Sequence, residues 1–74
     1  METYVDIYLS VDGEKASVID QGLISIGLKH SLGVHDYLYD WNGIVENKEV
    51  IQLADRIQSA LKGTGVLFKL TTVR

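Results

Sequence analysis

The sequence predicts an α+β sandwich in which two helices cover one face of an antiparallel sheet, with the element order βαββαβ. Three observations predict it. Apolar residues alternate with polar ones near the start of the chain, apolar residues recur at helical spacing in two later segments, and β-branched and apolar residues crowd the end. The 74 residues are enough for one hydrophobic core, so we expect a single domain over residues 1–74.

The first strand is predicted over residues 3–11, where the chain alternates strictly. One face holds Thr3, Val5, Ile7, Leu9 and Val11, and the other holds Tyr4, Asp6, Tyr8 and Ser10. A helix is predicted next, because the following apolar residues are spaced by three, four and three positions. They are Ala16, Ile19, Leu23 and Ile26. We expect Asp12 to be the N-cap of this helix and Gly27 to end it.

The second predicted helix has the clearest apolar stripe in the chain. The stripe consists of Val50, Leu53, Ala54, Ile57 and Leu61. Asn47 is expected at the N-cap of this helix and Gly63 at its end. The last strand is predicted over residues 66–73, which are mostly β-branched and apolar. Its inward residues are expected to be Val66, Phe68 and Leu70.

The middle of the chain decides the number of strands. A single strand over residues 34–41 would give a three-stranded βαβαβ fold. A two-residue type II′ turn at Gly33-Val34 would instead form a hairpin in which His30 lies opposite Tyr37 and Leu32 faces the core. That register collects apolar and aromatic side chains on one face, so we favour the hairpin and a ferredoxin-like βαββαβ sandwich. The three-stranded fold is the alternative.

The predicted sheet leaves one face without a helix, and we call it the open sheet face. The residues expected there as an interaction surface are Tyr4, Asp6, Tyr8, Asp36, Leu38, Asp40, Leu67 and Lys69. Exposed aromatic and apolar residues on so small a domain are typical of a surface that binds another protein. We therefore expect a non-enzymatic assembly or protein-interaction module that forms a homodimer, through this face or the last strand, or binds an unknown protein.

Composition excludes several kinds of chemistry. The chain has 7 basic and 10 acidic residues, a net charge of −3, which disfavours binding to nucleic acid. It has no Cys and two His, so we expect no disulfide, no metal site and no cofactor. No nucleophile motif accompanies His35, which is predicted to be a half-buried histidine with a satisfied ring. No catalytic residue is therefore expected.

The start of the chain is acidic and soon interrupted by charge, unlike a signal peptide. No apolar run approaches the roughly 18 residues of a membrane span. These features predict a cytoplasmic protein that does not bind a membrane.

Two resemblances add expectations. The strand over residues 3–11, the Asp12-Gly13 turn and the helix after it resemble the opening of ACT-type ligand-binding modules. This resemblance implies an alternative function, a regulatory domain that binds a small molecule near Asp12 and Gly13 at a boundary between paired domains. The runs over residues 35–41 and 61–73 resemble small archaeal proteins of unassigned function, which implies an archaeal origin.

Overall fold

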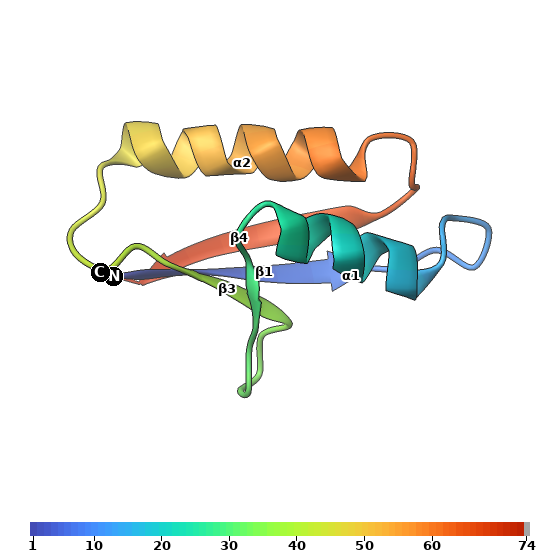
Figure 1. Cartoon of the computed structure of the whole chain (residues 1–74), viewed down its shortest axis with the longest axis horizontal. Helices are drawn as coiled ribbons and strands as arrows, with labels where there is room; N and C mark the ends of the chain where they lie inside the picture. Colours follow the sequence, from blue (N-terminus) through green and yellow to red (C-terminus); the bar gives the residue numbers. More distant parts are fainter. Residues whose placement is uncertain (74) are drawn as a thin grey trace.

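The computed structural model describes residues 1–73 and contains four strands and two helices (Figure 1). In chain order they are β1 (Glu2–Tyr8), α1 (Ala16–Ser25), β2 (Lys29–His30), β3 (Tyr37–Asp40), α2 (Asn47–Leu61) and β4 (Leu67–Val73). The strands form one antiparallel sheet in the order β2-β3-β1-β4. The predicted α+β class, four-stranded antiparallel sheet and two helices are confirmed, and the three-stranded alternative is wrong because β2 pairs with β3.

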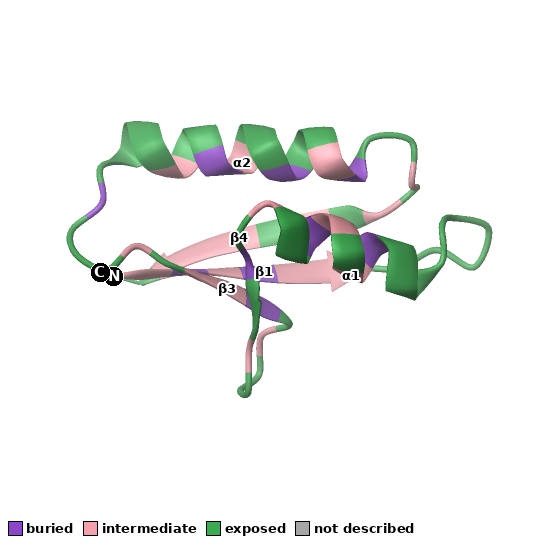
Figure 2. Cartoon of the chain, in the orientation of Figure 1, coloured by how far each residue is buried: buried purple, intermediate pink, exposed green. Residues whose placement is uncertain are grey.

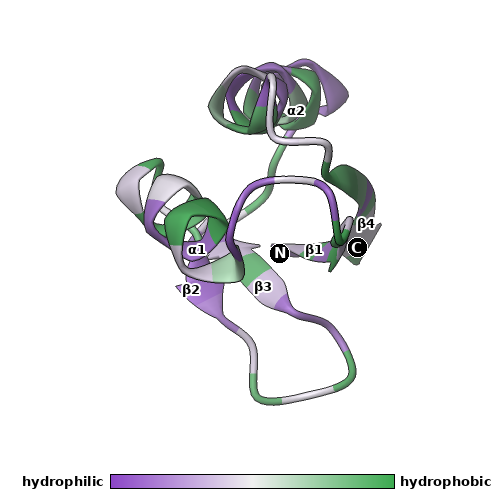
Figure 3. Ribbon diagram, turned by 90° about the vertical axis from the view of Figure 1, so that its right-hand side faces the viewer, coloured by the Kyte–Doolittle hydropathy of each residue, from purple (hydrophilic) through white to green (hydrophobic). Residues whose placement is uncertain are grey.

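Both helices lie on the same side of the sheet (Figure 3). One core cluster joins them to it, because Val5 and Tyr37 of the sheet pack with residues of α1 and α2. The helical members are Ile19, Leu23, Leu53, Ile57 and Leu61. Buried residues occupy the side of α2 that faces the sheet, and its opposite side is exposed (Figure 2). The apolar spacing in the sequence therefore predicted the packed faces of both helices, except at Ala16, which is exposed at the start of α1.

The first strand is shorter than predicted. Thr3 and Val5 are buried, as the alternation predicts, but β1 ends at Tyr8. Leu9 and Val11 are exposed, so their predicted place in the core is wrong. The chain turns away there because the backbone N–H of Glu14 donates to the carbonyl of Thr64 at 3.0 Å, which holds this loop against the loop before β4.

The start of α1 was predicted incorrectly and its end correctly. The N-cap is Lys15 rather than Asp12, whose N–H donates to the Ser10 hydroxyl at 3.3 Å within the preceding loop. At the other end, Gly27 has φ +103, and its N–H donates to the Ile24 carbonyl at 3.0 Å. The backbone N–H of Leu28 donates to the carbonyl of Leu23 at 3.3 Å, and the two bonds together form a Schellman motif.

The β2–β3 hairpin has the predicted register but not the predicted turn. His30 pairs with Tyr37. The two strands are joined by a loop over residues 31–36, in which Gly33 lacks the positive φ that a type II′ turn requires. Leu32 is fully exposed in this loop, so its predicted core position is wrong. β3 starts only at Tyr37 because side chains, described below, take over the backbone hydrogen bonds before it.

The second helix and last strand agree closely with the prediction. The N-cap of α2 is Glu46, one residue before the predicted Asn47, and the Glu49 carboxylate accepts a hydrogen bond from its N–H at 3.2 Å. Gly63 has φ +80 and follows the helix end, as expected. The residues predicted to face inward from the last strand pack against the core: Val66, Phe68 and Leu70.

Candidate functional site

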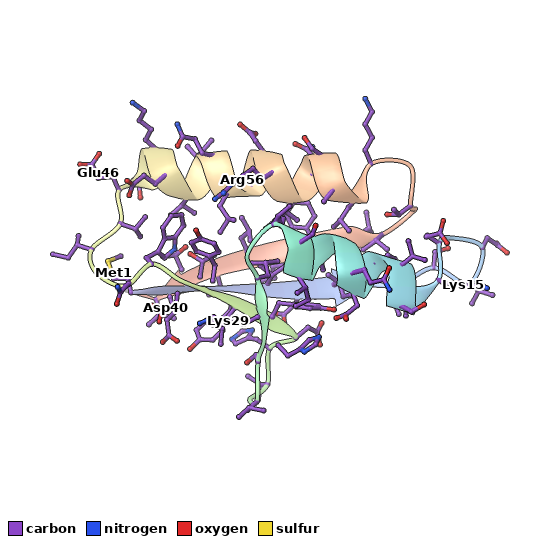
Figure 4. The ribbon with its side chains drawn as sticks, in the orientation of Figure 1. Met1, Lys15, Lys29, Asp40, Glu46 and Arg56 are labelled. Atoms are coloured by element: carbon purple, nitrogen blue, oxygen red, sulfur yellow. The ribbon has the colours of Figure 1, made fainter. Side chains whose placement is uncertain are left out.

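The sheet register brings the predicted interaction residues together on the open sheet face. Tyr4 lies between Leu38 of β3 and Thr71 of β4. Asp6 lies beside Lys69, and Tyr8 beside Leu67. Asp40 lies opposite Glu2, and both Asp40 and Lys29 project from the side of the sheet away from the helices (Figure 4). Asp36 sits at the same face, in the loop before β3.

The centre of this face is polar. The Asp6 carboxylate accepts a hydrogen bond from the backbone N–H of Asp36 at 3.1 Å, and its other oxygen lies 2.8 Å from Nδ1 of His35. The Asp36 carboxylate in turn accepts from the N–H of Ile7 at 3.0 Å. These contacts replace the backbone pairing between β1 and the chain before β3, and they end the pairing at Tyr37.

His35 is half-buried with a hydrogen-bonded ring, as expected, but it lies on the other face of the sheet. Strand alternation would place it inward, on the side of Tyr37. Instead its ring stacks on Tyr4, with centroids 4.5 Å apart, because the loop over residues 31–36 is not extended. The hydrogen bond from His35, the N–H of Asp36 and the charge of Lys69 together lower the pKa of Asp6 and keep it ionised.

Apolar side chains are exposed at both ends of β4, with Lys69 and Thr71 between them on the open sheet face. Tyr8, Leu67 and Val73 remain 57%, 71% and 52% exposed. Leu67 lies directly across from Tyr8, so the two side chains form one patch. The open sheet face thus has a polar centre, and its exposed apolar pair of Tyr8 and Leu67 lies at the sheet edge.

A second histidine–carboxylate contact, not found from the sequence, ties α1 to the hairpin. Asp20 accepts a hydrogen bond from the Tyr37 hydroxyl at 2.6 Å and lies 2.6 Å from Nε2 of His30. These two bonds lower the pKa of Asp20, whereas burial and the Asp20 carboxylate raise that of Tyr37. The predicted register placed His30 opposite Tyr37, but their shared acceptor depends on where α1 lies over the sheet.

Tyr39 of β3 and Trp41, which directly follows β3, pack against the core cluster. Tyr39 and Trp41 meet edge to face with centroids 4.6 Å apart. Arg56 points from α2 toward the sheet, 5.7 Å from the Tyr39 ring (Figure 4). The indole N–H of Trp41 donates to the Thr3 hydroxyl at 2.8 Å, so its polar edge is satisfied.

The Asp12-Gly13 turn borders a shallow hollow of about 400 Å³. Its lining residues are Ser10, Asp12, Gly13, Glu14, Gly63, Thr64 and Gly65. Gly13 is required by close packing, because a Cβ there would lie 2.5 Å from the Thr64 carbonyl oxygen. The hollow therefore results from two loops that touch through their backbones.

A larger groove, which the sequence did not reveal, lies between α2 and the start of β4. It has a volume of about 690 Å³. It is lined by Asp55, Gln58, Ser59, Leu61, Lys62, Val66, Leu67 and Phe68. In the sequence, the polar residues that line this groove lie on the polar side of the second helix, a pattern typical of a side that faces water. Only the position of β4 beside them makes a groove.

No family model, curated protein or solved structure matches this chain significantly. Within residues 1–73, no helix combines the length and apolar character needed to cross a membrane. The same residues contain no group of three or more His, Cys, Asp or Glu side chains arranged to hold a metal ion. Function is therefore inferred from the surfaces described above.

Proposed function

We propose that this chain is a non-enzymatic assembly module that forms a homodimer through its open sheet face or β4. The observation that carries the proposal is the exposed pair of Tyr8 and Leu67, where the open sheet face meets the sheet edge, with Val73 exposed at the other end of β4. Covering such residues removes apolar area from water, which is the main driving force for association. The net charge of −3 favours a protein partner over nucleic acid.

The proposal includes a ferredoxin-like arrangement of the sheet. The element order βαββαβ and the antiparallel pairing of β1 with both β3 and β4 support it. A cytoplasmic location and the resemblance to small archaeal proteins remain predictions from the sequence.

Substituting Leu67 by Asp should dissociate the dimer, because it sets a carboxylate in the apolar patch beside Tyr8. We expect light scattering coupled to gel filtration to give twice the chain mass of 8.2 kDa for the parent protein and a single-chain mass for Leu67→Asp. Leu32→Asp is the matched control, since Leu32 is also exposed, at 102% against 71% for Leu67, but lies in the hairpin loop. A parent protein that is monomeric at every concentration, or a Leu67→Asp variant that stays dimeric, contradicts the proposal.

The hollow at Asp12 and Gly13 favours a second candidate function, a regulatory domain of ACT-like design that binds a small molecule. A ligand that binds only the folded state adds about 2.7 kcal/mol of stability at 100 times its dissociation constant. We therefore expect one amino acid or nucleotide at millimolar concentration to raise the melting temperature, and Asp12→Asn to reduce that shift. A screen of both compound classes without any shift would exclude this function.

A further inference from the structure

The geometry points to one specific occupant for the groove between α2 and β4. We propose that a second copy of this chain docks there, with the two copies related by a two-fold axis through the groove. The inference rests on the proposed function, and it names the surface that the homodimer uses. The proposed dimer gives Asp55 and Lys62 a role in association, although neither residue belongs to the open sheet face.

The sheet edge at β4 is open to an additional strand. β4 pairs with β1 along its whole length, Leu67–Val73, and lies at the end of the strand order. Within residues 1–73, no element lies beyond β4 in the end-on view, and α2 lies above the sheet to one side of β4 (Figure 3). An edge strand presents a row of backbone N–H and C=O groups that another strand can complete. The occupant of this edge is therefore extended chain.

The groove above this edge has an apolar floor and a charged rim. Leu61, Val66 and Phe68 belong to the core or pack against it, and they line the groove from below. Asp55 of α2 and Lys62, which directly follows the last residue of α2, also line it and are exposed. A partner that covers this apolar floor therefore fits best if it also offers a positive charge to Asp55 and a negative charge to Lys62.

The two rim charges cannot satisfy each other within one chain. Asp55 lies on α2 and Lys62 is the residue that caps the end of this helix, seven positions later, which separates them by about 10 Å along the helix axis. Two helical turns place them on the same stripe of the helix. Among the ion pairs formed by residues 1–73, neither residue takes part.

A two-fold axis satisfies both charges at once. If the axis passes between Gln58 and Ser59, the two α2 helices run antiparallel across it. Asp55 then faces Lys62 of the partner subunit, and Lys62 faces Asp55 of the partner subunit. One surface thus supplies both halves of two ion pairs, which is the self-complementarity that a symmetric dimer requires.

The charges also favour an axis between Gln58 and Ser59 over an axis nearer either charged residue. An axis at Asp55 would set two carboxylates against each other, and an axis at Lys62 would do the same with two ammonium groups. The midpoint between them carries only an amide and a hydroxyl. Phe68 lines the same stretch of groove, so the axis there would place the two Phe68 rings together.

The same arrangement covers Ile51, which is 62% exposed on α2. Ile51 lies four residues before Asp55 on the same side of α2, next to the residues that line the groove but not among them. Pairing of the two β4 strands would join the sheets of both copies into one, and it would leave Tyr4 and Leu38 of the open sheet face uncovered. The dimer therefore keeps a surface for a further partner.

Charge-reversal variants test the arrangement. In both Asp55→Lys and Lys62→Glu, the two expected ion pairs become two like-charge contacts, so each variant should dimerise about tenfold more weakly than the parent. Mixed in equal amounts, the two variants should associate with each other at close to the parent affinity, because each supplies the charges that the other lacks. Sedimentation equilibrium at low salt measures all three constants, and high salt should shrink the differences.

Lys48→Glu is the matched control, because it makes the same charge change on α2 at a residue that does not line the groove. Its dimerisation constant should equal that of the parent. If the parent protein dimerises and both reversal variants dimerise as strongly as the parent, the groove is not the dimer interface. The open sheet face is then the remaining dimer surface. A parent protein that never dimerises overturns the proposed function itself.

Discussion

Replacing Leu53 with alanine is expected to lower the free energy of unfolding by about 2–5 kcal/mol. Leu53 is 0% exposed and lies on the inner side of α2, in the cluster that joins both helices to the sheet. The substitution removes apolar contacts and leaves a cavity that a tightly packed interior fills only in part. A domain of this length has a total stability of only about 4–11 kcal/mol, so a large share would be lost.

Urea unfolding followed by circular dichroism, at one fixed protein concentration, measures this loss. Leu32→Ala is the matched control, because it removes the same atoms from a fully exposed side chain. The control should change the free energy of unfolding by less than about 0.5 kcal/mol. Equal effects for the two variants would mean that α2 does not cover the sheet as described.

The parts of the fold that the sequence predicted are those set by local periodicity. Alternation on β1 placed Thr3 and Val5 in the core, and helical spacing on α2 placed Leu53 there. These patterns hold because a strand or helix must turn one side toward the interior whatever surrounds it. The hairpin register was favoured for a similar reason, since a shift by one residue would separate the apolar and aromatic residues of the two strands onto opposite faces.

The parts that were predicted incorrectly are the points where elements end. Leu9, Val11 and Leu32 continue an apolar pattern but lie in exposed loops. The strand ends there are decided by contacts between distant segments, such as the carboxylate of Asp36 on the N–H of Ile7. Periodicity carries no information about such contacts, so it extends each strand for as long as apolar residues continue.

The candidate surfaces also include parts that the sequence predicts and parts that it does not. Strand alternation placed Tyr4, Asp6 and Tyr8 on one face, and the register of β4 added Leu67 and Lys69 to it. The position of His35 and the groove above β4 depend on loops whose paths the sequence does not specify. The helix stripe that carries Asp55 and Lys62 gains significance only when β4 lies beside it.

Replacing Gly13 with alanine should destabilise the fold by about 1–3 kcal/mol, since overpacking forces neighbouring groups apart. The added Cβ would lie 2.5 Å from the carbonyl oxygen of Thr64, which already accepts the N–H of Glu14 at 3.0 Å. The Cα of Gly13 itself lies only 3.5 Å from where a Cβ on Gly65 would stand. Both contacts involve backbone, so relief requires one loop to move and would disturb the start of β4.

Gly22→Ala makes the same change where the structure leaves room, and it should have the opposite sign. No atom lies within 4 Å of a Cβ at Gly22, which is inside α1. Alanine there reduces the freedom of the unfolded chain and should raise the free energy of unfolding by about 0.4–1 kcal/mol. In urea unfolding, the free energy of unfolding should therefore be lower than the parent's for Gly13→Ala and higher than the parent's for Gly22→Ala. A Gly13→Ala variant as stable as Gly22→Ala would show that the two loops do not touch, and the hollow between them would no longer support a ligand site.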